Sequence, residues 1–300
     1  MTLGVSLAAG DCAKKPPPPT ESQTDPPTLR IAGGEIECQI KSQPAGISRD
    51  QLVEWVRAAA RAVSGYYHHF PTTRLTVVIS SESRWHDING QTYGASRIEI
   101  EFGPRVTVAD LKDDWVLTHE MFHLAFPDLR ESHLWMNEGL STYLEPIARA
   151  RVGNLPVERV WQQMIDGFPE SQSEADNGGL NHDATWGRTY WGGCMFWLLV
   201  DIHVRQQTHN RHSLDDALRA ILEAGGNGAV HWPVQRVIAT ADAATGMTAL
   251  QDQYNQMADK AFNLDLTKFW RQMGVRQVGG HIRYDDSAPL ASIRRAITAP

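Results

Sequence analysis

The chain has 300 residues, of which 42% are hydrophobic and 21% charged, a composition typical of a globular protein long enough to bury a sizeable core. Its formal net charge of −7, with no cluster of Lys and Arg, argues against a nucleic-acid-binding surface. The most apolar stretch, residues 194–200 (CMFWLLV), is far shorter than the roughly 20 residues that a membrane-spanning helix requires. We therefore expect a buried helix there and no transmembrane segment.

The first residues differ from the rest of the chain. LGVSLAAG resembles the end of the apolar region of a signal peptide, although no positively charged segment precedes it, and PPPP and DPP follow. We expect residues 1–28 to form a disordered leader or Pro-rich tether and residues 29–300 to form one domain. We also expect an exported protein of the periplasm or cell envelope, with a cytoplasmic location as the alternative. Cys12, Cys38 and Cys194 are too few for a disulfide framework, but one bridge between Cys38 and Cys194 is compatible with export.

The first hundred residues predict a mixed sheet with one long helix. Ser48 and Gln51 form a capping box ahead of an apolar pattern of helical period up to residue 63. RLTVVIS (74–80) is typical of a buried strand. RIEIEF (97–102) alternates apolar and acidic residues and predicts a half-exposed strand.

The remainder predicts a mainly helical region. Thr107 and Asp110 indicate the start of a helix that runs to Pro127. Further helices are expected at 135–145, 157–168, 188–207, 213–226, 248–260 and 265–273. The fold class is therefore α+β, with an N-terminal sheet lobe, a C-terminal helical lobe and the 107–127 helix at their junction, where active-site clefts are favoured. Four tryptophans in these apolar patterns are expected in the core: Trp115, Trp135, Trp186 and Trp197. The alternative for Trp186, and for Trp191 nearby, is a place in the lining of a substrate cleft, because the two flank Tyr190.

The helix at the junction contains HEMFH. His119 and His123 are four residues apart and can present both imidazoles to one metal ion, because such residues share a helix face. Glu120, next to the first histidine, is placed to hold and deprotonate a water. The alternative is that the motif arose by chance, and two histidines alone do not decide between the two.

A third ligand can be sought among nearby residues. The extended motif with a further Gly and His is excluded because those positions are Phe126 and Leu129. His133 and Glu131 fall in a turn, where side chains are usually solvated. Glu138 lies in WMNEGLSTYLE, at the start of a helix that can pack back against the first one. Two His and one Glu leave the fourth tetrahedral position open, as in catalytic zinc sites, so we predict Zn²⁺, one per chain, held by both histidines and Glu138.

Glu145, seven residues after Glu138, lies on the same helix face. It can accept the distal N–H of a metal-bound histidine, or it can be a surface residue before Pro146.

HEMFH followed by WMNEGLSTYLE resembles the gluzincin zinc metallopeptidases, in particular the glycyl-aminopeptidase family and, more distantly, the membrane-alanyl-aminopeptidase family. Residues 188–222, which begin RTYWGGC, resemble the segment that follows the active site in the first of these families. The resemblance implies a thermolysin-like catalytic domain, zinc-dependent hydrolysis of peptide or protein substrates, Glu120 as general base and Tyr190 as oxyanion stabiliser.

One departure bears on specificity. The relatives carry a Gly-x-Met-Glu-Asn strand whose glutamate holds the free amine of the substrate, whereas the comparable stretch here, GASRIEIEF (94–102), offers no evident carboxylate to the metal. We therefore expect specificity to lie in this stretch and in the loop 127–133. The departure also leaves an alternative function open, a catalytically inactive zinc-fold binding module of the cell envelope.

Overall fold

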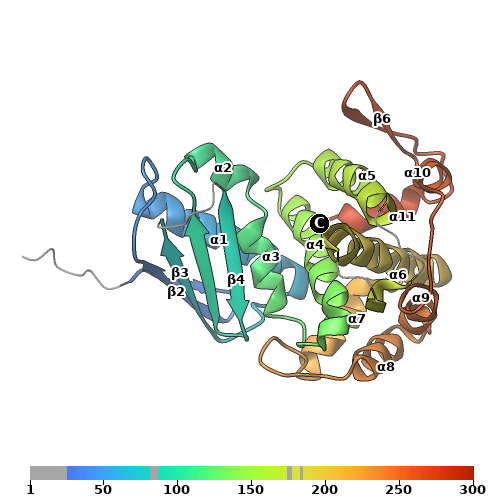
Figure 1. The fold of residues 1–300 in the computed structure, drawn as a ribbon, viewed down its shortest axis with the longest axis horizontal. Coiled ribbons are helices and arrows are strands. Elements are labelled where there is room, and N and C mark those ends of the chain that lie inside the picture. The colour runs from blue at the N-terminus through green and yellow to red at the C-terminus, as the bar shows by residue number, and fades with distance from the viewer. Residues whose placement is uncertain (1–25, 82–86, 174–177, 183–184) are drawn as a thin grey trace, which may run out of the picture.

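The computed structural model describes residues 26–81, 87–173, 178–182 and 185–300. The leader expected at residues 1–28 lies almost wholly outside the described residues and stays a prediction, although Thr28 already begins the first strand. Figure 1 shows a sheet with its long helix in one half of the molecule and a group of helices in the other. This arrangement confirms the predicted α+β class at the level of a mixed sheet followed by helices.

The sheet has five strands in the order β1-β2-β3-β5-β4. They are β1 (Thr28–Ile31), β2 (Gly34–Ile40), β3 (Arg74–Ser80), β4 (Ile88–Tyr93) and β5 (Arg97–Phe102). Strands β2, β3 and β5 are parallel, and the edge strands β1 and β4 are antiparallel to their neighbours. β3 and β5 confirm the two predicted strands. β4, with the sequence INGQTY, was not predicted because its polar residues and glycine carry no apolar alternation.

The long helix α1 (Arg49–Tyr67) packs on the sheet and confirms the predicted capping box. The Ser48 hydroxyl accepts a hydrogen bond from the Gln51 amide, and the Gln51 side chain accepts one from the Ser48 amide. The buried face of α1 includes Leu52, Val56 and Val63 at helical spacing. The start of α1 and its buried face therefore both match what the sequence predicts.

The prediction of a single helix over residues 107–127 is wrong, because the chain forms two shorter helices there. α2 (Val108–Asp113) has the predicted Thr107–Asp110 capping box, and α3 (Val116–His123) follows after a break. The break lies at Asp114, whose carboxylate accepts hydrogen bonds from the amides of Val116 and Leu117 at 3.0 and 3.2 Å. An aspartate that caps a new first turn favours a restart of the helix over its continuation.

The second half is helical, as predicted, with shifted ends and further elements. Its α-helices are α4 (Leu134–Arg151), α5 (Val157–Ser173), α6 (Gly193–Thr208), α7 (Leu214–Glu223), α8 (Val234–Thr245), α9 (Ala249–Met257), α10 (Leu266–Met273) and α11 (Ala291–Thr298). Its shorter elements are η1 (Glu131–His133), η2 (Leu180–His182), the π-helix η3 (Arg188–Gly192) and the hairpin β6 (Val275–Val278) and β7 (His281–Tyr284). α4 continues past the predicted end because it is buried along most of its length, and this packing outweighs the hydrogen bond that Pro146 cannot donate.

A buried ion pair and a buried hydrogen bond join α4 to α7 and α6. The Arg151 guanidinium on α4 donates to Asp215 on α7 at 2.7 Å. On α6, Asp201 accepts hydrogen bonds from Arg205 at 2.9 Å and from the Tyr143 hydroxyl of α4 at 2.8 Å. The contacts of Arg151 and Tyr143 fix α4, which carries a site residue, relative to α7 and α6.

Cys38 and Cys194 are both buried free thiols, so the bridge considered from the sequence is not formed. Along the part of the chain that the structure describes, no helix is long and apolar enough to cross a membrane.

Candidate metal centre

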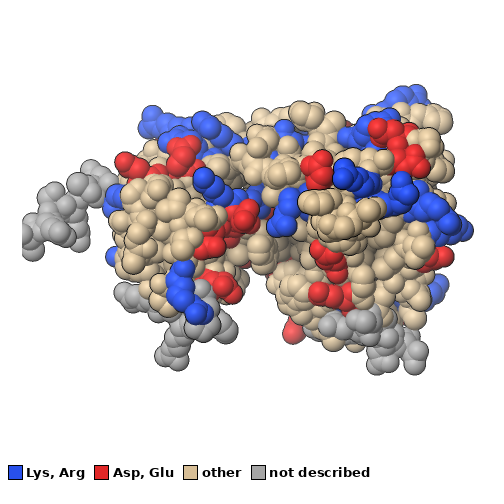
Figure 2. Space-filling model, turned by 90° about the horizontal axis from the view of Figure 1, so that it is seen from above, with Lys and Arg blue, Asp and Glu red and all other residues tan. Residues whose placement is uncertain are grey.

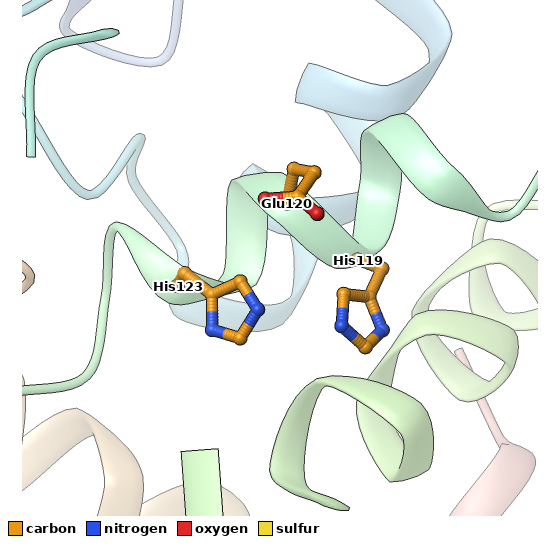
Figure 3. A group of neighbouring side chains, drawn as sticks. All are labelled: His119, Glu120 and His123. Carbon is orange, nitrogen blue, oxygen red and sulfur yellow. The ribbon is translucent and has the colours of Figure 1, made fainter. Parts of the chain in front are cut away.

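Helix α3 presents the two predicted histidines from one side. Figure 3 shows the His119 and His123 rings leaving the helix together, with Glu120 projecting from the position between them. One potential ligand atom from each of these three residues lies within 4.8 Å of the other two, and this is the metal-compatible group found among the described residues. The four-residue spacing therefore places both imidazoles on one face of the helix, as the sequence predicted.

Glu138 on α4 faces these imidazoles. Its Oε2 lies 3.0 Å from Nε2 of His119 and 3.6 Å from Nε2 of His123. α3 and α4 pack against each other after the short turn that contains η1, so the helix return expected from the sequence is present. Two nitrogens and one carboxylate oxygen thus converge, a donor set that fits Zn²⁺.

Burial and charge set the protonation states of these three side chains. Burial lowers the pKa of His119 below its usual value and outweighs the neighbouring carboxylates. Burial also acts to lower the pKa of His123, but hydrogen bonding to Glu138 and the charge of that carboxylate raise it overall. Burial would raise the pKa of Glu138, yet hydrogen bonds from His119 and His123 hold it well below its usual range. The lowered pKa values of Glu138 and His119 favour the ionised carboxylate and the neutral imidazole that metal binding requires, whereas the raised pKa of His123 opposes the neutral form of that ring.

Glu120 is held by the edge strand β4. The Thr92 Oγ1 lies 2.7 Å from Oε2 of Glu120 and 2.9 Å from its backbone oxygen, so the hydroxyl can donate to either acceptor. Gly90, two residues earlier on the same strand, allows this approach because a Cβ there would lie 2.6 Å from the Glu120 Cγ. One carboxylate oxygen of Glu120 is therefore engaged, and the residue lines the cleft.

Tyr190 reaches the same centre from the π-helix η3. Its ring stacks on that of His119, with centroids 5.9 Å apart. Burial raises the pKa of the Tyr190 phenol well above its usual value, and the charge of Glu138 and a hydrogen bond to it raise the pKa further. π-helical turns are rare and often occur at functional sites, and here the turn carries the phenol.

A cleft of about 370 Å³ opens beside these residues. It is lined by β4, by the end of α3 with Glu120 and His123, by the start of α4 with Glu138, and by Tyr190 of η3. The space-filling view is hollowed between the sheet half and the helical half of the molecule (Figure 2). All five residues predicted for the site are brought together, since His119 contacts Glu138 and Tyr190 directly.

The structure corrects the expected role of Glu145 and divides the two stretches in which specificity was expected. Glu145 forms a buried ion pair with Arg149, while Nδ1 of His119 has no hydrogen-bond partner among the described residues, so Glu145 does not orient that imidazole. Of the two stretches in which specificity was expected, the loop 127–133 lines the cleft with Asp128 and Leu129, whereas the stretch 94–102 contributes Gly94 to the lining, and α3 packs mainly against β4. Sequence reasoning therefore missed Thr92 and Gly90, and the polar pattern of INGQTY carries no signal that would have identified them.

The tryptophans divide into two groups. Trp135 and Trp197 are buried as predicted, but Trp115 and Trp186 are 44% and 55% exposed. The Trp115 ring meets His119 edge-on at 5.2 Å, and the Trp186 ring stacks on Tyr190 at 5.3 Å. Both therefore lie at the metal centre instead of in the core.

The fold is similar to that of solved zinc metallopeptidases. An aminopeptidase N family protein from Idiomarina loihiensis matches over 83% of this chain and 49% of its own, with a TM-score of 0.65 and 12% identity. An M1 zinc metallopeptidase from Deinococcus radiodurans matches over 76% of this chain and 49% of its own, with a TM-score of 0.50 and 15% identity. Native yeast LTA4 hydrolase matches over 83% of this chain and 44% of its own, with a TM-score of 0.55 and 12% identity.

No family model and no curated protein sequence matches the chain. The chain spans about half the length of the solved structures it resembles. At these identities the likeness establishes the fold, and the fold is that of the matched half of the M1 zinc metallopeptidases.

Proposed function

We propose that this protein is a zinc-dependent peptidase of the gluzincin type, with a thermolysin-like catalytic domain and an aminopeptidase-like mechanism. The observation that carries the proposal is the convergence of Glu138 on His119 and His123 beside Glu120. The likeness in fold to M1 zinc metallopeptidases supports it.

His119, His123 and Glu138 would hold one Zn²⁺ per chain. Both nitrogens and the carboxylate oxygen already point at one another, and three protein ligands leave one position open for water or substrate. Glu138 is assigned as the third ligand because its Oε2 lies 3.0 and 3.6 Å from the two Nε2 atoms, and Glu120, which is grouped with the same histidines, is assigned as the base. When bound, the ion supplies positive charge that polarises the scissile carbonyl and makes the attacking water more acidic.

The residues of the chain perform the proton transfers. Glu120 accepts a proton from the attacking water and returns it to the nitrogen of the leaving amine as the peptide bond breaks. Thr92 leaves the second oxygen of Glu120 available for this exchange. The Tyr190 hydroxyl donates a hydrogen bond to the oxygen of the carbonyl as negative charge develops there.

The arrangement favours an enzyme over a non-catalytic zinc module. A structural zinc site is normally closed by four protein ligands and requires neither a general base nor a phenol. Here three candidate ligands are accompanied by Glu120 and Tyr190, and both line the cleft.

The test combines metal analysis with a peptide panel. Protein purified without chelators should contain one zinc per chain, and it should hydrolyse aminoacyl or internally quenched peptides in a manner that a chelator abolishes. Absence of zinc would contradict the site, and bound zinc without any hydrolysis would favour the binding-module alternative.

A further inference from the structure

A second pocket lies on the side of α3 that faces away from the cleft. Its volume is about 540 Å³, which falls within the range of small-molecule sites. α1 packs against α2, α3 and α4, and residues of all four helices line the pocket (Figure 1). Among the described residues, this lining shares none with the lining of the cleft beside Glu120. The pocket is therefore separate from the candidate metal centre.

Much of the lining is apolar. α1 contributes Trp55, Ala58 and Ala59, and α2 contributes Val108 and Leu111. The two alanines leave space beside the indole of Trp55, because their side chains are short. A molecule that fills this space removes its own apolar surface and that of the pocket from water, which is favourable.

The lining contains one hydroxyl, and this hydroxyl lacks a partner. Thr118 of α3 is 4% exposed and lines the pocket, but its hydroxyl makes no hydrogen bond with any described residue. A hydroxyl withdrawn from water costs free energy unless it is hydrogen-bonded. Helix residues two apart are turned by about 200°, so Thr118 faces away from Glu120. A molecule that reaches Thr118 thus binds behind the metal helix.

The charges around the pocket balance and are largely engaged. Two acidic and two basic residues line it: Glu54, Asp114, Lys112 and Arg149. The Asp114 carboxylate accepts hydrogen bonds from the Trp55 indole at 3.1 Å and from two backbone amides. Glu54 and Arg149 are each paired with an ion outside the lining, and Lys112 is exposed to solvent, where an ion pair contributes little. A charged ligand would therefore lose hydration without gaining a buried partner.

We propose that this pocket binds a small, uncharged, mainly apolar molecule that carries one hydroxyl or amide group. The apolar body lies against Trp55 and α2, and the hydroxyl or amide forms a hydrogen bond with Thr118. The bound molecule contacts α2 and α3 on both sides of the break at Asp114, so it stabilises the two helices relative to each other. The site contains no reacting group and does not depend on the proposed peptidase function.

Four probes of similar shape test the class of ligand. They are 3-phenylpropanol, butylbenzene, 3-phenylpropylammonium and 3-phenylpropanoate, each titrated into the full chain at pH 7 by ligand-observed NMR. Butylbenzene should bind about two- to tenfold more weakly than the alcohol, the factor that one net hydrogen bond supplies. The two ions should bind at least about tenfold more weakly, because burying a charge costs more than burying a hydroxyl. No saturable binding of the alcohol, or equal affinity for all four probes, would overturn the proposal.

A filled pocket tests where the alcohol binds. Ala58→Leu adds three carbon atoms to the lining and should weaken binding of the alcohol by about tenfold or more, because a ligand can then enter only by overpacking. Ala58 is partly exposed, so the variant should still fold, and thermal unfolding checks this. The matched variant Ala239→Leu makes the same change on an exposed position of α8 and should bind as the wild type does. Equal affinity of the two variants would overturn the location.

Thr118→Val tests the hydrogen bond. The substitution keeps the shape of the side chain, so butylbenzene should bind as before, whereas the affinity for the alcohol should fall to that of butylbenzene. A general loss of structure would weaken both probes, and the comparison therefore separates it from loss of the hydroxyl. An unchanged ratio between the two probes would overturn the role of Thr118. Binding is measured without any peptide, so its failure is distinct from a failure of hydrolysis.

Discussion

Gly139 and Gly193 lie back to back where α4 crosses the start of α6. A Cβ on Gly139 would lie 2.3 Å from the Gly193 Cα, and a Cβ on Gly193 would lie 2.0 Å from the Trp135 backbone oxygen. Gly139 follows Glu138 in the chain, and Gly193 lies one turn after Tyr190. The close approach of these two backbones therefore brings the phenol to the carboxylate.

Replacing Gly193 by Ala should separate the two helices. We expect the free energy of unfolding to fall by about 1–3 kcal/mol, because the new methyl group overpacks a backbone contact. Hydrolysis should fall as well, because Tyr190 moves away from Glu138. Thermal unfolding and peptide kinetics measure the two effects. In the matched variant Gly65→Ala, the new Cβ would lie 3.2 Å from the Val152 side chain, which is 39% exposed, and stability should change by less than about 1 kcal/mol. Equal behaviour of the two variants would contradict this role of the crossing.

Thr92→Val should impair the general base without disturbing the fold. The substitution keeps the shape of the side chain and removes the hydroxyl that lies 2.7 Å from the Glu120 carboxylate. We expect kcat to fall by about tenfold, a fraction of the full contribution of a general base, with little change in KM or zinc content. Thr92→Ser retains the hydroxyl and should restore most of the rate. A serine variant as slow as the valine variant would show that packing, and not the hydrogen bond, is responsible.

Tyr190→Phe should lower kcat by about 10²–10³, the loss typical for one oxyanion donor. The Phe ring keeps the stacking on His119, so zinc content and thermal stability should stay close to those of the wild type. Steady-state kinetics measures the change in kcat, and metal analysis of the same sample measures its zinc content. A loss of zinc in this variant would mean that Tyr190 supports the ligands instead of the reaction.

The sequence predicted the parts of the site that follow from local spacing. His119 and His123 share a helix face because of a four-residue interval, and Glu138 returns to them because a short turn joins two helices. β3 and β5 were predictable because their apolar patterns are strong, and the Ser48 capping box was predictable because it depends on residues three apart.

The parts that depend on contacts between distant segments could not be predicted. Thr92 meets Glu120 across 28 residues of chain. The exposure of Trp115 and Trp186 also depends on tertiary packing, since their local patterns match those of the buried Trp135 and Trp197. Glu145 and Arg149 are four residues apart on one helix, so their ion pair is a local contact. Whether Glu145 pairs with Arg149 or with a histidine of α3 nevertheless depends on how α4 packs.

Asp215→Asn tests the buried ion pair with Arg151. Burial would raise the pKa of Asp215, but the adjacent Arg151 guanidinium holds it below its ordinary value of 3.8. A carboxyl whose pKa is lower in the folded state stabilises the fold above its ordinary pKa, and it loses that contribution as pH falls through the lowered value. The variant should therefore be about 3 kcal/mol less stable at pH 7, because Arg151 keeps its hydrogen bonds to the Ile297 carbonyl but loses its anionic partner.

The difference between wild type and Asp215→Asn should shrink below about pH 4, as the wild-type carboxylate gains its proton. Chemical denaturation at a series of pH values measures it. Glu54→Gln breaks an exposed pair with Arg57 and should change stability by less than about 1 kcal/mol. A difference for Asp215→Asn that does not depend on pH would contradict the assignment.

Glu120 and Glu138 are both carboxylates beside the same two imidazoles, but their proposed roles differ. Only Glu138 is assigned as a ligand, so Glu138→Gln should weaken zinc binding, whereas Glu120→Gln should keep one zinc per chain and lose the general base. The most direct test is the zinc content of the Glu120→Gln protein, measured on the sample whose peptide hydrolysis is assayed. We predict one equivalent of zinc and a rate reduced by about 10²–10⁴. Loss of the zinc, or wild-type hydrolysis with the zinc retained, would contradict the account.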